Sequence, residues 1–233
     1  MMKKWMILVV AVCLLLAGCG KANQKADADA GKEPGVETSP STSVNAEQNV
    51  PGVIVQPLPD TTMDNLNDGI LSVSLEEGDA YVDDTGVMQM DVKIFAYDRF
   101  DMAAISDLKA GDTIVTHAGE VKVDSVERSA GGIVCINGGL EAGGFDLVTD
   151  ESGIFYETGL NDAKNWYEVG EATIRVSVDF RGHDYSDPNQ GDVVLYPGSF
   201  LVDEVKNYDF TPFNTTIRVE DGQIVELTRV YVP

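Results

Sequence analysis

Oxygen-bearing side chains are concentrated in one short segment, in which His183 is followed by Asp184, Asp187, Asn189 and Asp192. Carboxylate and amide oxygens are the ligands that calcium prefers, and neighbouring glycines permit a tight turn. The spacing differs from that of an EF-hand loop. The segment therefore predicts either a calcium site on the last four side chains or a plain polar connection between two strands. A general base formed by His183 and a carboxylate is a further interpretation.

Aromatic side chains crowd the second half of the chain. Most of them are expected in the core, because each buries a large apolar area. Trp166 and Tyr167 are the best candidates for exposed rings, and a flat arrangement of such rings beside acids would favour sugar binding. The sequence therefore predicts a ligand-binding surface that includes Trp166, Tyr167 and His183, and no cofactor other than calcium.

The sequence motifs of common catalytic sites do not occur in this chain: it has no G-x-S-x-G, H-E-x-x-H, C-x-x-C or Walker loop. Ser106 and Lys109 match S-x-x-K, a spacing that average lysine usage produces by chance, and no S-D-N or K-T-G accompanies it. An envelope hydrolase would need Ser106 or His183 to converge with carboxylates in one pocket. A binding protein is therefore favoured over an enzyme.

Three further features have plain structural interpretations. Cys135 lies in an apolar run, which predicts a buried strand residue that behaves as a small hydrophobe. His117 lies in a segment typical of a hairpin tip, where a histidine is usually solvated. The glycine-rich segment 137–144 favours a loose loop, although such glycines also permit a ligand to approach the backbone closely.

The elements that must position these residues are mainly strands. Apolar and polar residues alternate over 71–75, 88–94 and 174–180, which predicts strands with one wet face. The apolar run 133–136 predicts a strand that is buried on both sides. Asp221-Gly222 between two apolar runs over 215–232 predicts a hairpin, because this pair suits the positive φ angles of a type I′ turn.

Helix signals are few. Asp101 is a candidate N-cap for one or two helical turns, with Ile105 and Leu108 facing inward. A second short helix is expected over 200–207. The predicted fold is therefore mainly β, an antiparallel barrel or sandwich with one or two short helices, and a division into two β subdomains that meet near 101–110 is the alternative.

The charge of the chain excludes some partners. Sixteen Lys and Arg face 39 Asp and Glu, so the formal charge at pH 7 is −23. Most of the excess acid lies after residue 50, in the part that is predicted to fold. Such a surface repels phosphate backbones, so nucleic acid is excluded as a partner.

The N-terminus consists of Lys3 and Lys4, an uncharged apolar run over 5–18, and then Cys19. The run is shorter than the roughly 20 residues that a membrane-spanning helix needs. These are the parts of a secretory signal peptide. Leu16-Ala17-Gly18-Cys19 resembles the lipobox of bacterial lipoprotein precursors. The resemblance implies cleavage before Cys19, fatty acyl chains such as palmitate on that cysteine, and a protein anchored in the bacterial cell membrane on its extracytoplasmic face.

The chain is accordingly divided into three parts. Residues 1–18 are the predicted signal peptide, and 19–50 are a lipidated flexible tether that is too polar to fold. Residues 51–233 are the acidic β domain, which resembles uncharacterised bacterial surface lipoproteins. The expected function is a membrane-anchored module that binds an envelope ligand or protein. A calcium-dependent binding module that uses the loop 184–192 is the alternative, followed by an envelope hydrolase.

Overall fold

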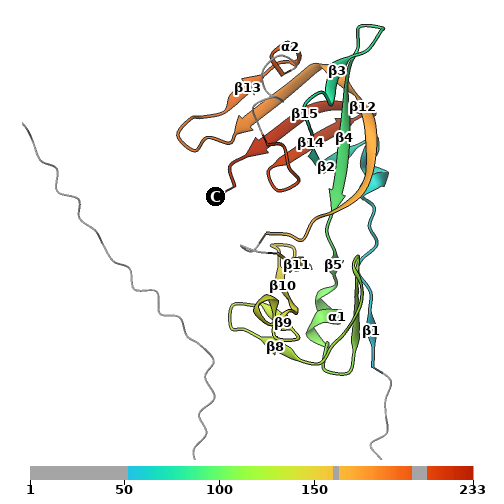
Figure 1. Ribbon diagram of the computed structural model, residues 1–233, viewed down its shortest axis with the longest axis vertical. Helices are drawn as coiled ribbons and strands as arrows, with labels where there is room; N and C mark the ends of the chain where they lie inside the picture. The colour runs from blue at the N-terminus through green and yellow to red at the C-terminus, as the bar shows by residue number, and fades with distance from the viewer. Residues whose placement is uncertain (1–51, 160–162, 201–208, 233) are drawn as a thin grey trace, which may run out of the picture. The chain divides into compact units, whose positions relative to one another are not determined.

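A computed structural model describes residues 52–159, 163–200 and 209–232 (Figure 1). The predicted signal peptide and tether, 1–18 and 19–50, lie outside the described residues, as does the helix expected over 200–207 apart from Phe200.

Seven strands form the largest sheet, in the order β13-β12-β15-β14-β2-β4-β3. Their bounds are β2 Gly69–Ser74, β3 Ala80–Val82, β4 Met88–Ala96, β12 Tyr167–Tyr185, β13 Val193–Leu195, β14 Thr215–Glu220 and β15 Gln223–Val230. Strand β12 also pairs with β4, so β12, β15, β14, β2 and β4 form a closed ring. Inward-facing side chains of this ring, among them Val73, Ile94 and Ile217, form one buried hydrophobic cluster.

The ring closes because β12 is long and strongly curved (Figure 1). Its first half pairs antiparallel with β4, and its second half pairs parallel with β15 and antiparallel with β13. Between Val176 and Arg181 the register with β15 shifts, and the alternation of buried residues is interrupted there. Val178 is 82% exposed, so the prediction that it faces the core is wrong; the extra residues of the bulge turn it outward.

A second buried cluster lies in the middle of the chain and includes Phe100, Ile114 and Leu147. Two further sheets surround it, with orders β1-β6-β7 and β5-β11-β10-β9-β8. Their bounds are β1 Ile54–Val55, β5 Arg99–Phe100, β6 Thr113–Thr116, β7 Gly119–Lys122, β8 Val126–Arg128, β9 Val134–Ile136, β10 Phe145–Thr149 and β11 Phe155–Thr158. Within β9 only alternate residues are buried, so the prediction of a strand buried on both sides is wrong.

Short helices connect these strands: α1 Met102–Ser106, α2 Pro197–Ser199, and the 3-10 turns η1 Thr62–Leu66 and η2 Leu140–Ala142. The predicted N-cap of α1 is confirmed, because the Asp101 carboxylate accepts hydrogen bonds from the backbone N–H groups of Ala103 and Ala104. Ile105 and Leu108 are buried, as predicted.

The predicted hairpin near the C-terminus is also confirmed. β14 and β15 pair antiparallel, and Asp221 and Gly222 at the turn have φ angles of 48° and 68°. The mainly β fold with short helices and a barrel-like closed sheet confirms the predicted class. Most strand pairs are antiparallel, and β1–β6 and β12–β15 are parallel. Among the described residues, no helix has the length and apolar character needed to cross a membrane.

Candidate functional site

Three segments lie side by side next to the ring: 96–99, which is distant in the sequence, and the neighbouring segments 156–158 and 164–167. Tyr167 pairs with Ala96, Tyr156 pairs with Arg99, and Thr158 pairs with Lys164. Successive side chains of an extended chain point to opposite sides. The residues of these segments therefore separate into an aromatic set and a polar set, which are described in turn.

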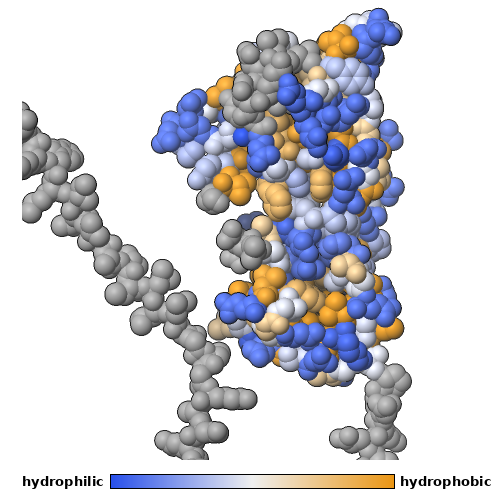
Figure 2. Space-filling view, viewed as in Figure 1, coloured by the Kyte–Doolittle hydropathy of each residue, from blue (hydrophilic) through white to orange (hydrophobic). Residues whose placement is uncertain are grey.

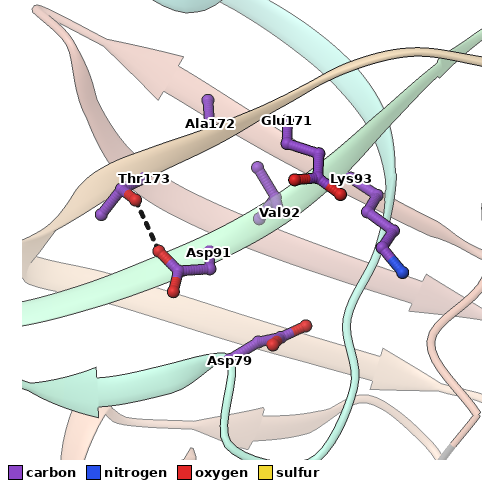
Figure 3. Close-up of a pocket in the computed structure, with 7 residues that line it drawn as sticks. All are labelled: Asp79, Asp91, Val92, Lys93, Glu171, Ala172 and Thr173. Atoms are coloured by element: carbon purple, nitrogen blue, oxygen red, sulfur yellow. Dashed lines mark hydrogen bonds between the residues drawn. The ribbon is translucent and has the colours of Figure 1, made fainter.

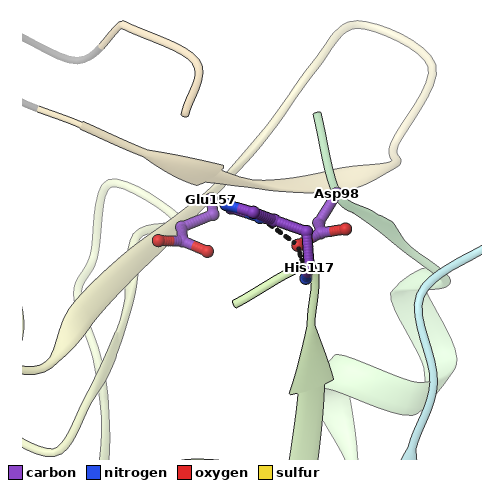
Figure 4. A group of neighbouring side chains, drawn as sticks. All are labelled: Asp98, His117 and Glu157. Carbon is purple, nitrogen blue, oxygen red and sulfur yellow. Dashed lines mark hydrogen bonds and ion pairs between the residues drawn. The ribbon is translucent and has the colours of Figure 1, made fainter. Parts of the chain in front are cut away.

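The polar set is built on Asp98, which follows β4, and His117, which follows β6 (Figure 4). The Asp98 carboxylate oxygen Oδ2 lies 2.7 Å from the backbone nitrogen of His117, whose N–H it accepts, and 3.0 Å from Nδ1 of the imidazole. The Asp98 side chain is 3% exposed and that of His117 is 27% exposed. Two contacts from one buried carboxylate thus fix both the backbone and the ring of His117.

Tyr167 and Glu157 complete this polar set. The Tyr167 ring stacks on the His117 ring, with 4.3 Å between centroids and 18° between planes. Burial, followed by the negative charge of Asp98, raises the pKa of Tyr167 to about 12. Burial also raises the pKa of Glu157, against the opposing effects of a hydrogen bond from Asn165 and the proximity of His117.

Asp98, His117 and Glu157 together offer a donor set with one imidazole and two carboxylates. Their ligand atoms lie within 4.8 Å of one another, and Figure 4 shows the imidazole between the two acidic side chains. Nitrogen and oxygen donors of this kind suit transition metals such as zinc. The same three groups are suited to proton transfer, because a fixed imidazole lies beside a carboxyl of raised pKa.

The aromatic set surrounds a cation. The Lys164 ammonium lies 4.1 Å from the centroid of the Tyr97 ring, 5.6 Å from that of Tyr156 and 5.5 Å from that of Trp166. It also donates a hydrogen bond of 3.0 Å to the Tyr97 hydroxyl. The Tyr97 ring stands nearly perpendicular to the rings of Trp166 and Tyr156, at 81° and 78°. We call these three rings and Lys164 the three-ring site.

Trp166 and Tyr167, both predicted as ligand-binding residues, therefore belong to different sets. Trp166 packs against Tyr97, whereas Tyr167 stacks on His117. The sugar-binding interpretation required three or four coplanar rings that include these two, and Trp166 and Tyr167 instead contact different partners. Trp166 lines a pocket of about 270 Å³ with Tyr97 and Lys164, and the aspartate Asp60 lies at the same pocket.

His183, the third predicted ligand-binding residue, lies near the end of β12. Its Nδ1 is 2.9 Å from Oδ2 of Asp192, and its ring is parallel to that of Tyr185 at a centroid distance of 6.3 Å. The side chains of His183 and Asp192 are 27% and 32% exposed. Burial, followed by the charge of Asp192, raises the pKa of Tyr185.

The four residues of the predicted calcium site have separate contacts. Asp184 accepts a hydrogen bond from the Ser186 backbone and lies 3.7 Å from the Arg229 guanidinium. Asp187 accepts hydrogen bonds from Asn189. Asp192 contacts His183. Among the described residues, the carboxylates of this loop do not form a group of three ligands, and calcium binding there stays a prediction.

The two residues considered for a hydrolase, Ser106 and His183, lie at different pockets. Ser106 lines a pocket with Ser129 and Phe155, next to the second hydrophobic cluster. His183 lines a different pocket, with Arg218 and Glu226. The Ser106 pocket has no carboxylate among its lining residues, whereas Asp179 and Glu226 line the His183 pocket, so a hydrolase that uses His183 stays a prediction. The glycine-rich segment 137–144 lines neither pocket.

A fourth pocket lies on the wet face of β4 and β12 (Figure 3). It has a volume of about 430 Å³ and is lined by the acids Asp79, Asp91 and Glu171 together with Lys93. The Thr173 hydroxyl donates a hydrogen bond of 2.6 Å to Asp91. This surface is acidic and open, and its lysine is already paired with Glu76.

Two smaller sequence predictions need correction. His117 is not simply solvated at a hairpin tip, because a buried aspartate and a tyrosine hold its ring. Cys135 is half-buried rather than buried, and burial raises the pKa of its thiol to about 11, so it remains protonated at neutral pH. The sequence analysis does not identify Asp98, Glu157 or Tyr97 as site residues. The signal that could have found them is a repeated pair of adjacent residues, Tyr97-Asp98 and Tyr156-Glu157, in two strand-like segments.

Comparisons of this chain with models of known protein families, with curated proteins and with solved structures find no match.

Proposed function

We propose that this protein is a lipid-anchored binding module on the extracytoplasmic face of a bacterial membrane. Cys19 carries the anchor, and 19–50 act as a spacer between the membrane and the acidic β domain. Two acyl chains hold a protein at a bilayer stably, because each buried CH₂ contributes about 0.8 kcal/mol.

The observation that carries the binding function is the three-ring site. Tyrosine and tryptophan combine a large apolar area with a polar handle, and they are enriched at recognition surfaces. Here three partly exposed residues from three strand-like segments place their rings around one ammonium group. Because residues 51–233 hold far more acids than bases, their field attracts positively charged ligands and repels anionic ones. Figure 2 shows hydrophilic residues spread over the visible face of the domain.

The anchor is tested by expressing the full chain and Cys19→Ala in bacterial cells and measuring how much protein sediments with membranes. Wild type is expected in the membrane fraction with acyl chains on Cys19. Cys19→Ala is expected to lose acylation and cleavage. Cys13→Ala, which removes a thiol from the apolar run and leaves Cys19, is the matched control and is expected to behave as wild type. An unmodified Cys19 in an intact wild-type precursor would refute the anchor.

The binding function is tested with solubilised envelope extract over the immobilised full chain. Saturable binding at micromolar concentration is expected, with a loss of at least tenfold in Trp166→Ala. Tyr196→Ala is the control, because Tyr196 is an exposed ring that contacts Arg181 instead. Equal binding by the two variants, or no binding by wild type, would count against the three-ring site as the binding surface.

A further inference from the structure

The three-ring site has the geometry of a cation-binding site that one of the protein's own residues fills. A cation is attracted to an aromatic face when it lies within about 6 Å of the ring centroid. The Lys164 ammonium meets this condition for three rings at once. Among the described residues no carboxylate lies within ion-pair distance of it, so its direct contacts there are the rings and the Tyr97 hydroxyl, and its charge acts on Asp150 at longer range.

A primary ammonium is not the cation that suits such rings best. It has three N–H donors, and ring faces replace the water hydrogen bonds of those donors poorly. In the three-ring site the Tyr97 hydroxyl accepts one of the three. A quaternary ammonium has no N–H donor, so it loses no hydrogen bond when it leaves water for the rings.

An external ligand has a route to these rings. Tyr97, Trp166 and Lys164 all line the pocket of about 270 Å³, and the rings of Tyr97, Tyr156 and Trp166 are each partly exposed. Asp60 and Arg99 line the same pocket with opposite charges, so the attraction of cations comes from the acidic domain as a whole, which raises their local concentration. Because Lys164 belongs to the same chain, it competes with such a ligand at high effective concentration.

We propose that the three-ring site binds a trimethylammonium group, and that Lys164 occupies the site in its absence. The ligand displaces the Lys164 ammonium into solvent and places its own cation against Tyr97, Tyr156 and Trp166. This assignment rests on the proposed binding function and names the chemical class of its ligand. Free choline-like molecules and choline lipid headgroups share this chemistry.

The test uses Trp166 itself as the reporter. The chain has two tryptophans, so the full chain with Trp5→Phe carries Trp166 as its single indole. Tetramethylammonium chloride is titrated while the emission of Trp166 and the heat of binding are followed, with sodium chloride at equal ionic strength as the reference. Weak saturable binding is expected in the parent. Lys164→Ala is expected to bind at least tenfold more tightly, because the internal competitor is gone.

Matched variants separate this effect from a change in net charge. Lys93→Ala removes the same charge from a lysine that lines another pocket and pairs with Glu76. It is expected to leave the affinity for tetramethylammonium unchanged. Lys164→Gln serves as a second uncharged variant, so that a folding defect of Lys164→Ala does not decide the result. Adding Trp166→Leu to Lys164→Ala is expected to abolish the heat of binding. 3,3-Dimethylbutanol, the uncharged isostere of choline, is expected not to bind.

The two sources of the group are then compared on Lys164→Ala. A response of Trp166 to free choline but not to phosphatidylcholine vesicles assigns a soluble ligand, and a response to the vesicles assigns a lipid headgroup. The proposal is overturned if neither Lys164→Ala nor Lys164→Gln binds tetramethylammonium saturably, or if Lys93→Ala gains as much affinity as they do. Membrane attachment through Cys19 and capture of an envelope ligand are measured separately, so this failure would leave those results standing.

Discussion

The two histidines of the chain are placed in groups of the same composition but different burial. His117 lies 3.0 Å from Asp98 and stacks on Tyr167, while His183 lies 2.9 Å from Asp192 with its ring parallel to that of Tyr185. Asp98 is 3% exposed and Asp192 is 32% exposed. The two contacts have nearly the same length, so their distances alone do not distinguish their contributions to stability. Burial of the carboxylate and the number of donors it satisfies decide those contributions.

The neighbouring glutamates reinforce the contrast. Glu157 lies beside His117, and burial raises its pKa. Glu226 lies near His183, and a hydrogen bond from Arg218 lowers its pKa. The surroundings of His117 therefore disfavour the charged form of Glu157, whereas the surroundings of His183 favour the charged form of Glu226. This difference makes the former the better candidate for chemistry in which a carboxyl holds its proton more strongly than an ordinary glutamate does.

The largest expected effect comes from truncating the two aspartates. Asp98→Ala leaves the His117 backbone N–H and ring nitrogen without their acceptor, so we expect a loss of about 2–4 kcal/mol in the free energy of unfolding. Asp192→Ala removes a partly exposed pair and is expected to cost less than about 1 kcal/mol. Urea unfolding of both variants and wild type measures the difference. Similar losses for the two variants would contradict the role given to burial.

This contrast also marks the limit of what the sequence predicts. Local patterns are sufficient for β2, β4, the capped helix α1 and the type I′ hairpin, because alternation, an N-cap aspartate and Asp-Gly each act over a few residues. His183 and Asp192 are close in the chain, so their proximity could be anticipated. Asp98 and His117 are 19 residues apart in the sequence and meet only through the fold.

The same reasoning explains the other misses. The position of Val178 depends on where β12 leaves β4 for β15, a long-range pairing that period-two spacing cannot encode. The three-ring site needs Tyr97, Tyr156 and Trp166 to meet across strand pairs. The sequence analysis predicts that Trp166 and Tyr167 act together. Adjacent residues of an extended segment point to opposite sides, so one belongs to the aromatic set and the other to the polar set.

A second prediction compares the two tyrosines by alkaline titration of the tyrosinate absorbance. Wild type is expected to show a late step from Tyr167, whose pKa is raised to about 12 by burial and by Asp98. Tyr167→Phe removes that step, and Tyr185→Phe leaves it in place. Asp98→Asn is expected to shift the step downward but to keep it above 10, because burial is the larger cause.

The stability follows the same titration. Between pH 10 and about 12 the folded state keeps a proton on Tyr167 that the unfolded state has lost, so the free energy of unfolding falls as pH rises through this window. Tyr167→Phe is expected to flatten that decline more than Tyr185→Phe does. A decline of equal slope in the two variants would show that the environments of the two tyrosines do not differ as described.

The smallest expected effect is on the pH dependence of stability, to which the two glutamates contribute with opposite signs. The pKa of Glu157 is raised above 4.5, so folded protein holds a proton that the unfolded chain has released, and wild type loses stability relative to Glu157→Gln as pH rises through that window. The pKa of Glu226 is lowered below 4.5, so the stability it contributes is complete above 4.5 and is lost as pH falls through the folded pKa. Wild type therefore gains stability relative to Glu226→Gln as pH rises. Melting temperatures of the three proteins between pH 3 and pH 7 measure both contributions. Contributions of the same sign would mean that the two histidine groups do not shift the pKa of the nearby carboxyl in opposite directions.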